Sequence, residues 1–226
     1  MGYARYRYYK GSLLPLEHKP FFQVDPKANA LYEGAKPRPF NRIPDAVREH
    51  PALLSMIRTL LEGVWGGELG DEVHCNIHPV RIRNFHEGVI HNNMHTTLEG
   101  THVDSVERVA VVLLERSNVR ADVPRTALYR GECPIGKRRD NPEDEAVLAP
   151  LRVTDKVLFE PLEAITFDDT HYKHDAEDSV PENPDLKCWR SVMLMMMRRP
   201  CSQESPLDGH AIDGYTPRSP RDVPSC

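Results

Sequence analysis

Two stretches of the chain are continuously apolar, and they limit most strongly what it can fold into. Residues 109–114 read VAVVLL and residues 192–197 read VMLMMM. Successive side chains of a strand point to opposite faces, so apolar side chains at both alternating positions mean that both faces are covered. We expect two inner strands of a layered β protein, with the methionines serving as core filling.

Including these two stretches, the chain has several short runs of β-type residues. They fall at residues 73–83, 106–116, 126–130, 157–161, 164–168 and 188–197. Short strands of this kind are typical of sandwiches and closed β folds. The sequence therefore predicts a mainly β fold with flanking helices.

A helical pattern precedes the strands, within residues 44–66. Apolar residues recur there at helical spacing: Leu53, Leu54, Ile57, Leu60, Leu61 and Val64. Pro51 suits the first turn of a helix and Gly66 suits its end. Before this helix, residues 1–43 begin with alternating aromatic and basic side chains and then become irregular, which predicts an N-terminal arm with an edge strand.

The length of 226 residues suits one domain with additions. We expect a single domain over residues 1–199, made of the arm, the helix and a β core over residues 70–199. Residues 200–226 are rich in Pro, Ser and Asp and poor in large apolar residues, which predicts a disordered or loosely attached tail. Within the core, the polar residues 131–150 predict a surface excursion, either a lid over a site or a tolerated insertion.

Charge and cysteine content narrow the classes of partner. The formal net charge of −5 provides no basic field for nucleic acid, and no apolar run approaches the roughly 18 residues that span a bilayer. The five cysteines are an odd number without CxxC spacing, and the first residues lack a secretory apolar segment. We expect a cytoplasmic protein with a small-molecule partner, no nucleic acid and no membrane.

A His-x-Asp pair stands out at the entry to one of the apolar strands. His102 and Asp104 are two residues apart, so on a strand both side chains would lie on the same face. An imidazole and a carboxylate on one face form two thirds of the 2-His-1-carboxylate triad that binds iron(II) and leaves positions open. The pair alone is weak evidence, because a chain with eleven histidines places one near an aspartate by chance.

A third ligand has to come from a distant segment, and FDDTHYKHD supplies His171 and His174, which spacing alone does not separate. The last strand carries Arg190 at the same parity as its apolar neighbours, so its guanidinium would be buried and would need a carboxylate partner. That partner is either the distal carboxylate of a 2-oxoglutarate or a protein acid such as Asp168 or Asp169.

Four segments resemble the iron(II)/2-oxoglutarate-dependent dioxygenases, and within them the branch of isoleucine dioxygenase-type free amino-acid hydroxylases. They are IHPVRI, LEGTHVDSVERVAVVLLERSNV, ITFDDTHYKHD and WRSVMLMMM, within residues 38–199. The chain departs from the family pattern at Pro79, at Leu98 and in the long excursion. The resemblance implies a double-stranded β-helix, the jelly-roll of the cupins.

The resemblance also implies a ligand set and a cosubstrate site. Fe(II) would be held by His102, Asp104 and His174, with His174 rather than His171 as the distal ligand. Arg190 would bind 2-oxoglutarate, which reacts with O2, and ascorbate would activate the enzyme in vitro. Because the carboxylate of Asp104 is retained, hydroxylation is expected rather than halogenation.

The substrate is expected to be a small polar metabolite such as a free amino acid, held by groups on the flanking segments. The candidates are Glu99, Arg81, His78 and Tyr129, while His91 and His95 suit either the site or a loop. Desaturation, cyclisation or epoxidation with the same cofactors is one alternative. Others are a cupin-like metal-binding protein without redox chemistry and a catalytically inactive interaction module.

Overall fold

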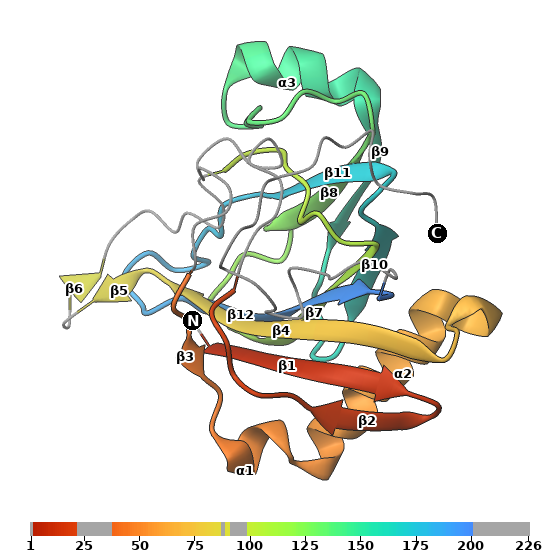
Figure 1. Cartoon of the computed structure of the whole chain (residues 1–226). Coiled ribbons are helices and arrows are strands. Elements are labelled where there is room, and N and C mark those ends of the chain that lie inside the picture. The colour runs from red at the N-terminus through yellow and green to blue at the C-terminus, as the bar shows by residue number, and fades with distance from the viewer. Residues whose placement is uncertain (1, 22–37, 87–88, 91–98, 201–226) are drawn as a thin grey trace.

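The computed structural model describes residues 2–21, 38–86, 89–90 and 99–200. Two β-sheets lie face to face in this part of the chain, with helices outside them (Figure 1). This is the double-stranded β-helix, or jelly-roll, that the resemblance implies.

The larger sheet has β12 (Trp189–Arg198) at its centre. Its strand order is β10 (Ala164–Asp168), β7 (Arg108–Ser117), β12, β4 (Glu72–Arg83), β1 (Gly2–Tyr9) and β2 (Ser12–Pro15), and the short β3 (Asn41–Arg42) also pairs with β1. The neighbours along this order are antiparallel. Both apolar stretches therefore lie inside the sheet, as their composition predicts.

The smaller sheet has the order β11 (Tyr172–Ala176), β8 (Arg125–Arg130) and β9 (Arg152–Val157). A separate hairpin joins β5 (Phe85–His86) and β6 (Val89–Ile90). The helix α3 (Pro142–Leu148) and the 3-10 turn η2 (Ala149–Leu151) lie beyond the smaller sheet, on its side away from β4 and β12 (Figure 1).

The outer face of the larger sheet is covered by α2 (Pro51–Trp65), which follows the short α1 (Asp45–Arg48). Pro51 opens α2 and the His50 side chain accepts from the Ala52 amide at 3.2 Å, while Gly66 ends it at φ +53°. The turn η1 (Gly66–Glu68) follows. Helical spacing of four buries Ile57, Leu61 and Trp65 against one side of the sheet.

The inner face of the larger sheet meets the smaller sheet across a second apolar cluster. Alternate residues of β7, β10 and β12 contribute to it, and Leu128 of β8 meets them from the other layer. The members of this cluster on the three strands are Val109, Val111, Leu113, Ile165, Phe167, Val192 and Met196. Arg190 lies at the start of β12, His102 and Asp104 lie on the loop that leads into β7, and His174 lies on β11 in the smaller sheet.

Several local predictions were wrong. The first strand is not at an edge, because β1 pairs with both β4 and β2 and is buried on both faces. The strand predicted at residues 157–161 lies earlier, as β9, and β11 was not predicted at all. The excursion is more than a surface loop, since its own residues Cys133 and Leu148 are buried against Ala127 and Tyr129 of β8. Residues 201–226, His91, His95 and Leu98 lie outside the described residues.

One expectation about membranes can be compared directly with the helices. Within the described ranges, no helix is both long enough and apolar enough to cross a membrane.

Candidate metal centre

Three side chains from distant segments converge between the two sheets. Ligand atoms of His102, Asp104 and His174 all lie within 4.8 Å of one another. Two imidazole nitrogens and one carboxylate oxygen form the 2-His-1-carboxylate set, which suits iron(II) and leaves coordination positions for other molecules. The donor types and their spacing therefore fit a mononuclear iron ion.

The two histidines are held together by their own main chains. His102 and His174 form an isolated β-bridge, with both N–H groups donating to the opposite carbonyl at 3.0 Å. The His102 Nδ1 lies 2.8 Å from the Gly100 carbonyl oxygen, which favours a proton on Nδ1 and leaves Nε2 as the ligand atom. The His174 Nε2 lies 3.5 Å from an Asp104 carboxylate oxygen.

Asp104 lies in a loop and not on a strand, so alternation along a strand is not what brings it to the site. β7 begins only at Arg108, after a turn in which Ser105 has φ +62°. The loop is held by Asp169, whose carboxylate accepts from the Asp104 amide at 2.9 Å and from the Val106 amide at 3.1 Å. A buried acid on the β10–β11 connection thus positions the loop that carries the candidate ligand.

The electrostatics of this cluster favour a bound cation. Burial raises the pKa of Asp104 above its ordinary value, and burial together with the charge of Asp104 raises that of Asp169 to about 7. Burial also holds the pKa of His174 well below its ordinary value, so this imidazole is neutral and its nitrogen can donate to a metal. A divalent ion would offset the cost of two close buried carboxylates.

Asp169→Asn is expected to weaken metal affinity about 10- to 100-fold, the range for partners that orient a metal ligand. The asparagine offers one oxygen to the Asp104 and Val106 amides and turns its own N–H donors toward them. Titration with iron(II) against a chelator measures the effect. The matched control is Asp168→Asn, because the Asp168 carboxylate faces Arg108 and Thr170 instead. Equal affinities in both variants would contradict the role of Asp169.

Arg190 is almost completely buried on the inner face of β12, with 1% of its surface exposed. Within the described part of the chain, its Nε and Nη2 atoms have no hydrogen-bond partner. The two protein acids considered for it are engaged elsewhere, since Asp168 pairs with Arg108 and Asp169 caps the Asp104 loop.

The surroundings of Arg190 favour the binding of an anion. Burial and the nearby Arg116 guanidinium lower the pKa of Arg190 to about 10, which still leaves it charged at neutral pH. A buried, charged and unpaired guanidinium is costly. A carboxylate from outside the protein would satisfy it with two parallel hydrogen bonds.

The four residues expected to hold a substrate fall into two groups. Glu99 and His78 lie inside: a Glu99 oxygen is 3.6 Å from the His102 Nε2, and His78 lies opposite Leu194, on the same face of the larger sheet as Arg190. Arg81 is on the other face, bonded to Ser191 and Glu115, with 58% of its side chain exposed. Tyr129 also faces away from the cluster, since it pairs with Lys173 on the opposite face of the smaller sheet from His174.

His171, the other candidate for the distal ligand, is exposed. Its side chain is 75% accessible and its Nδ1 lies 3.1 Å from an Asp168 oxygen. Three residues farther along, His174 is buried against Phe167, with ring centroids 4.8 Å apart. Of these two histidines, the structure brings only His174 to the cluster.

The excursion, residues 131–150, contacts the residues next to both histidines of the cluster, Thr101 beside His102 and Asp175 beside His174. Thr101, next to His102, donates its amide to the Lys137 carbonyl and accepts from the Gly136 amide, both at 2.8 Å. Gly100 has φ +64°, and a Cβ on it would lie 2.5 Å from the Lys137 oxygen, so a larger residue is excluded. The segment therefore supports the site instead of looping away from it.

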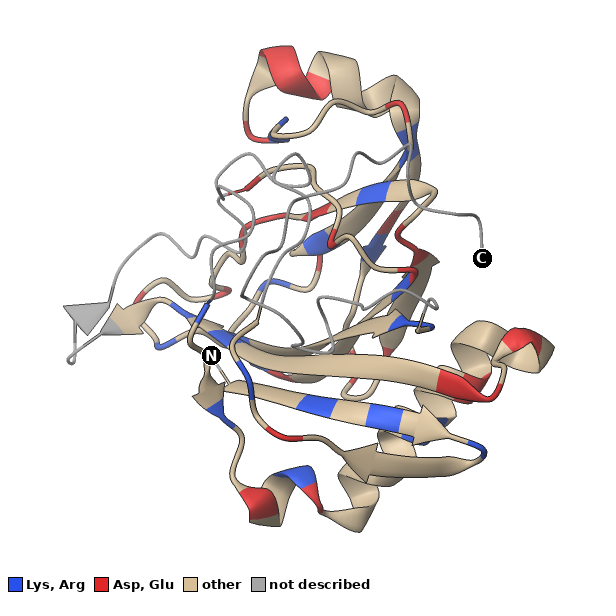
Figure 2. Cartoon of the chain, in the orientation of Figure 1, with Lys and Arg blue, Asp and Glu red and all other residues tan. Residues whose placement is uncertain are grey.

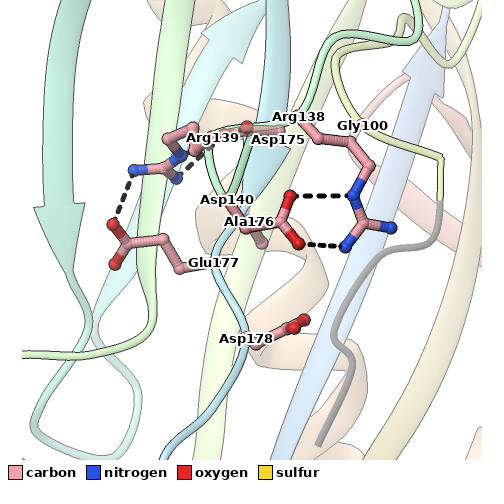
Figure 3. Close-up of a pocket in the computed structure, with 8 residues that line it drawn as sticks. All are labelled: Gly100, Arg138, Arg139, Asp140, Asp175, Ala176, Glu177 and Asp178. Carbon is pink, nitrogen blue, oxygen red and sulfur yellow. Dashed lines mark hydrogen bonds and ion pairs between the residues drawn. The ribbon is translucent and has the colours of Figure 1, made fainter. Parts of the chain in front are cut away.

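A second set of contacts joins the excursion to the residues after His174. Arg139, with 9% of its side chain exposed, contacts Asp175 at 2.8 Å, Asp155 at 2.9 Å and Glu177 at 3.1 Å. Figure 2 shows basic and acidic residues interleaved on the strands of the smaller sheet. Figure 3 shows the pocket between them, where these groups pair with one another. It is lined by Gly100, Arg138, Arg139, Asp140, Asp175, Ala176, Glu177 and Asp178.

Arg139→Met is expected to lower the free energy of unfolding by about 3–5 kcal/mol, because it leaves the buried carboxylate of Asp175 without its cation. Urea denaturation measures the change. The neighbouring Arg138→Met is the control, since Arg138 is 31% exposed and pairs with the exposed Asp140, and such pairs contribute about 0–1 kcal/mol. Similar losses in both variants would show that the Arg139 network adds little.

His78 is expected to make the protein sensitive to acid. Burial, with the nearby charge of Arg38, lowers the pKa of His78 from 6.5 to about 3. Between those pH values the unfolded chain takes up a proton that folded His78 refuses, so stability falls as pH falls through this window. In His78→Phe that contribution disappears, and the loss of unfolding free energy between pH 7 and pH 5 should be smaller. Equal losses in the two proteins would contradict this assignment.

Sequence reasoning missed several residues that shape the site. Asp169 was considered only as a partner of Arg190, and Arg139 only as part of a polar excursion. The signal for Asp169 was an acid directly before the histidine-bearing segment. Nothing in the local pattern distinguished Arg139 from Arg138, because the difference is one of burial.

Comparison with known proteins agrees with this geometry. A family model described as 2OG-Fe dioxygenase matches residues 1–196. A search of curated proteins gives no match.

Solved structures share the fold. A bsmA homolog from Methylobium petroleophilum PM1 superposes with a TM-score of 0.66 at 21% identity, over 87% of this chain and 70% of that one. The Fe(II)/(alpha)ketoglutarate-dependent dioxygenase TqaL gives 0.61 at 16%, over 89% and 67%. IDO from Bacillus thuringiensis gives 0.59 at 18%, over 88% and 73%.

The family match covers nearly the whole described chain and includes all three clustered side chains. It implies an oxidoreductase that uses iron(II), 2-oxoglutarate and O2 and acts on small molecules. The chain belongs to the 2OG-Fe dioxygenase family.

Proposed function

We propose that the protein hydroxylates a C–H bond of a small polar metabolite, a free amino acid or a derivative of one. The observation that carries the proposal is the cluster of His102, Asp104 and His174 together with the guanidinium of Arg190, whose buried Nε and Nη2 have no partner among the described residues. The first set suits the metal and the second suits the distal carboxylate of 2-oxoglutarate. A binding protein without redox chemistry would need the metal ligands but not this guanidinium.

The protein's own part in the reaction is to hold and orient. His102 and His174 would contribute Nε2 atoms and Asp104 a carboxylate oxygen to the iron, which when bound supplies the chemistry that couples O2 to decarboxylation of 2-oxoglutarate. Asp169 keeps the Asp104 loop in place, and Arg190 aligns the cosubstrate. The inner apolar cluster excludes water from the reacting groups.

The overall reaction balances as substrate, O2 and 2-oxoglutarate giving hydroxylated substrate, succinate and CO2. One oxygen atom enters the substrate and the other enters succinate. The carboxylate of Asp104 argues for hydroxylation rather than halogenation, because as a ligand it would leave no place for a halide beside the two histidines.

A free amino acid is supported by the four sequence segments that resemble the isoleucine dioxygenase-type hydroxylases. Glu99 supports it further, since a carboxylate 3.6 Å from the His102 Nε2 is suited to an ammonium group near the metal. We assign Arg81 and Tyr129 no part in substrate binding, because both lie on outward faces.

The proposed function is tested by a screen of free amino acids and related metabolites with iron(II), 2-oxoglutarate and ascorbate. At least one compound is expected to stimulate succinate release and to gain the mass of one oxygen atom. A product that has lost two hydrogens instead would indicate desaturation or cyclisation. If none of the compounds in the screen increased the release of succinate, the proposal of an amino-acid substrate would be contradicted.

We also propose that residues 1–199 act as one catalytic domain and that the protein works in the cytoplasm. The main support for a single domain is that β1, from the arm, is an inner strand of the same sheet as β12. The described cysteines Cys75, Cys133 and Cys188 are free and buried, which suits a reducing compartment.

A further inference from the structure

Two polar side chains on the inner face of β4 are buried without satisfying their hydrogen-bonding groups. Asn76 and His78 each have 2% of their surface exposed. The Asn76 oxygen accepts from the Tyr3 hydroxyl at 3.1 Å, but its Nδ2 has no partner among the described residues, and neither does either ring nitrogen of His78. Native proteins rarely leave such groups unpaired, because a buried polar group without a partner loses its hydrogen bonds to water and gains none in return.

Aromatic rings enclose the His78 imidazole. The Tyr3 ring stacks on it at 4.7 Å, and the Phe21 and Phe40 rings meet it edge-on at 4.9 and 5.1 Å. These rings fix the orientation of the imidazole without giving it a hydrogen bond. They also form an apolar wall next to two unsatisfied polar groups, a combination that is typical of a site for an amphipathic ligand.

A cationic side chain, that of Arg38, acts on His78. Arg38 pairs with Phe21 through main-chain hydrogen bonds of 2.8 and 3.1 Å, and its guanidinium lies 6.0 Å from the Phe21 ring centroid. Its charge adds to the burial that lowers the pKa of His78, and it partly opposes the burial that raises the pKa of Asp104. Arg38 is therefore near both the aromatic enclosure and the candidate metal ligand.

These groups are separate from the expected cosubstrate anchor. Arg190 is paired across the strands with Ile82, and His78 with Leu194. Four positions along β4 separate His78 from Ile82, about 13 Å at the rise of a strand. A ligand on Arg190 and a ligand on His78 can thus occupy the same interior at different places.

We propose that Asn76 and His78 form the subsite for the carboxylate of an amphipathic organic acid, whose apolar part lies against Tyr3, Phe21 and Phe40. The amide N–H group of Asn76 and one ring N–H of the neutral imidazole are donors, and the nearby cation favours an anionic acceptor. This inference rests on the proposed function, for which it names the substrate groups that are recognised.

The test is calorimetric titration under anaerobic conditions, with the protein loaded with iron(II) and 2-oxoglutarate and again without metal. The probes are L-leucine, L-isoleucine and L-phenylalanine, each beside its amide. At least one acid is expected to bind the wild type at least tenfold more tightly than its amide. His78→Phe and Asn76→Leu are expected to weaken that binding about 10- to 100-fold, the loss of a hydrogen bond to a charged group.

Two controls separate this subsite from folding and from the cosubstrate. His78→Phe keeps a ring among the aromatic residues and removes unpaired nitrogens, so it should unfold at no lower temperature than the wild type. His171→Phe makes the same change at an exposed histidine and should leave acid binding unchanged. Affinity for 2-oxoglutarate should be the same in the wild type, His78→Phe, Asn76→Leu and His171→Phe.

Three results would overturn the inference: no acid binds the wild type, the amide binds as well as the acid, or His78→Phe binds the acid unchanged. A loss of 2-oxoglutarate affinity in His78→Phe would overturn it as well, by assigning the groups to the cosubstrate. Failure of the proposed function looks different, because acid binding would persist while no probe stimulates succinate release.

Discussion

His174→Ala is expected to abolish stable iron(II) binding and oxygenase activity, whereas His171→Ala leaves both intact. His174 is buried, with its Nε2 3.5 Å from Asp104, while the side chain of His171 is 75% exposed. Removing a ligand should reduce metal affinity by more than about a hundredfold, since even partners that only orient a ligand cost about 10- to 100-fold. Titration with iron(II) and single-turnover succinate formation measure the two effects.

This pair of variants decides between two histidines that spacing does not separate. Both substitutions remove an imidazole from the same short segment, so a general loss of folding would affect both. Thermal unfolding of the metal-free proteins provides the check, with similar midpoints expected. Loss of iron binding in His171→Ala together with its retention in His174→Ala would reverse the assignment.

Arg190→Met should weaken 2-oxoglutarate binding about 10- to 100-fold while leaving iron affinity nearly unchanged. Hydrogen bonds to a charged group contribute about 1.5–3 kcal/mol, and 1.4 kcal/mol corresponds to a factor of ten. Two donor nitrogens of Arg190 are buried and have no partner in the part of the chain that the structure describes, so the cosubstrate would be their acceptor. Anaerobic titration of the iron-loaded protein with 2-oxoglutarate measures the affinity directly.

The stability of Arg190→Met distinguishes a binding role from a structural one. In the absence of an anion, a buried unpaired guanidinium is a cost to the fold, so the methionine variant should be at least as stable as the wild type. A structural ion pair would give the opposite result, a marked loss of stability. Arg190→Lys, which keeps the charge but not the two-pronged geometry, should retain part of the affinity.

The sequence predicted the layers of the fold better than its connections. The two apolar stretches form β7 and β12, because strands with apolar side chains on both faces are stable only where both faces of the sheet are covered. Of the helix predicted within residues 44–66, residues 51–65 form α2, where proline, spacing and glycine agree, whereas residues 45–48 form the separate α1. By contrast, β11 was missed because its residues, YKHDA, are polar, and only pairing with β8 makes them a strand.

The sequence predicted which residues form the candidate site, but not how the fold positions them. Resemblance to a family pointed to His102, Asp104, His174 and Arg190, and these residues are buried or half-buried inside. Alternation along a strand does not explain how Asp104 comes to lie beside His102, because a loop held by Asp169 positions Asp104. Arg81 and Tyr129 face outward because register, which the sequence does not show, decides the face of each strand.

The main-chain pairing of His102 with His174 has a consequence for how the ion is acquired. Because reciprocal amide bonds set the separation of the two imidazoles in advance, little conformational entropy remains to be lost when the metal enters. The apoprotein is thus a preorganised receptor, unlike small zinc domains that fold only around their ion. A chelator should therefore remove the metal ion without unfolding the jelly-roll.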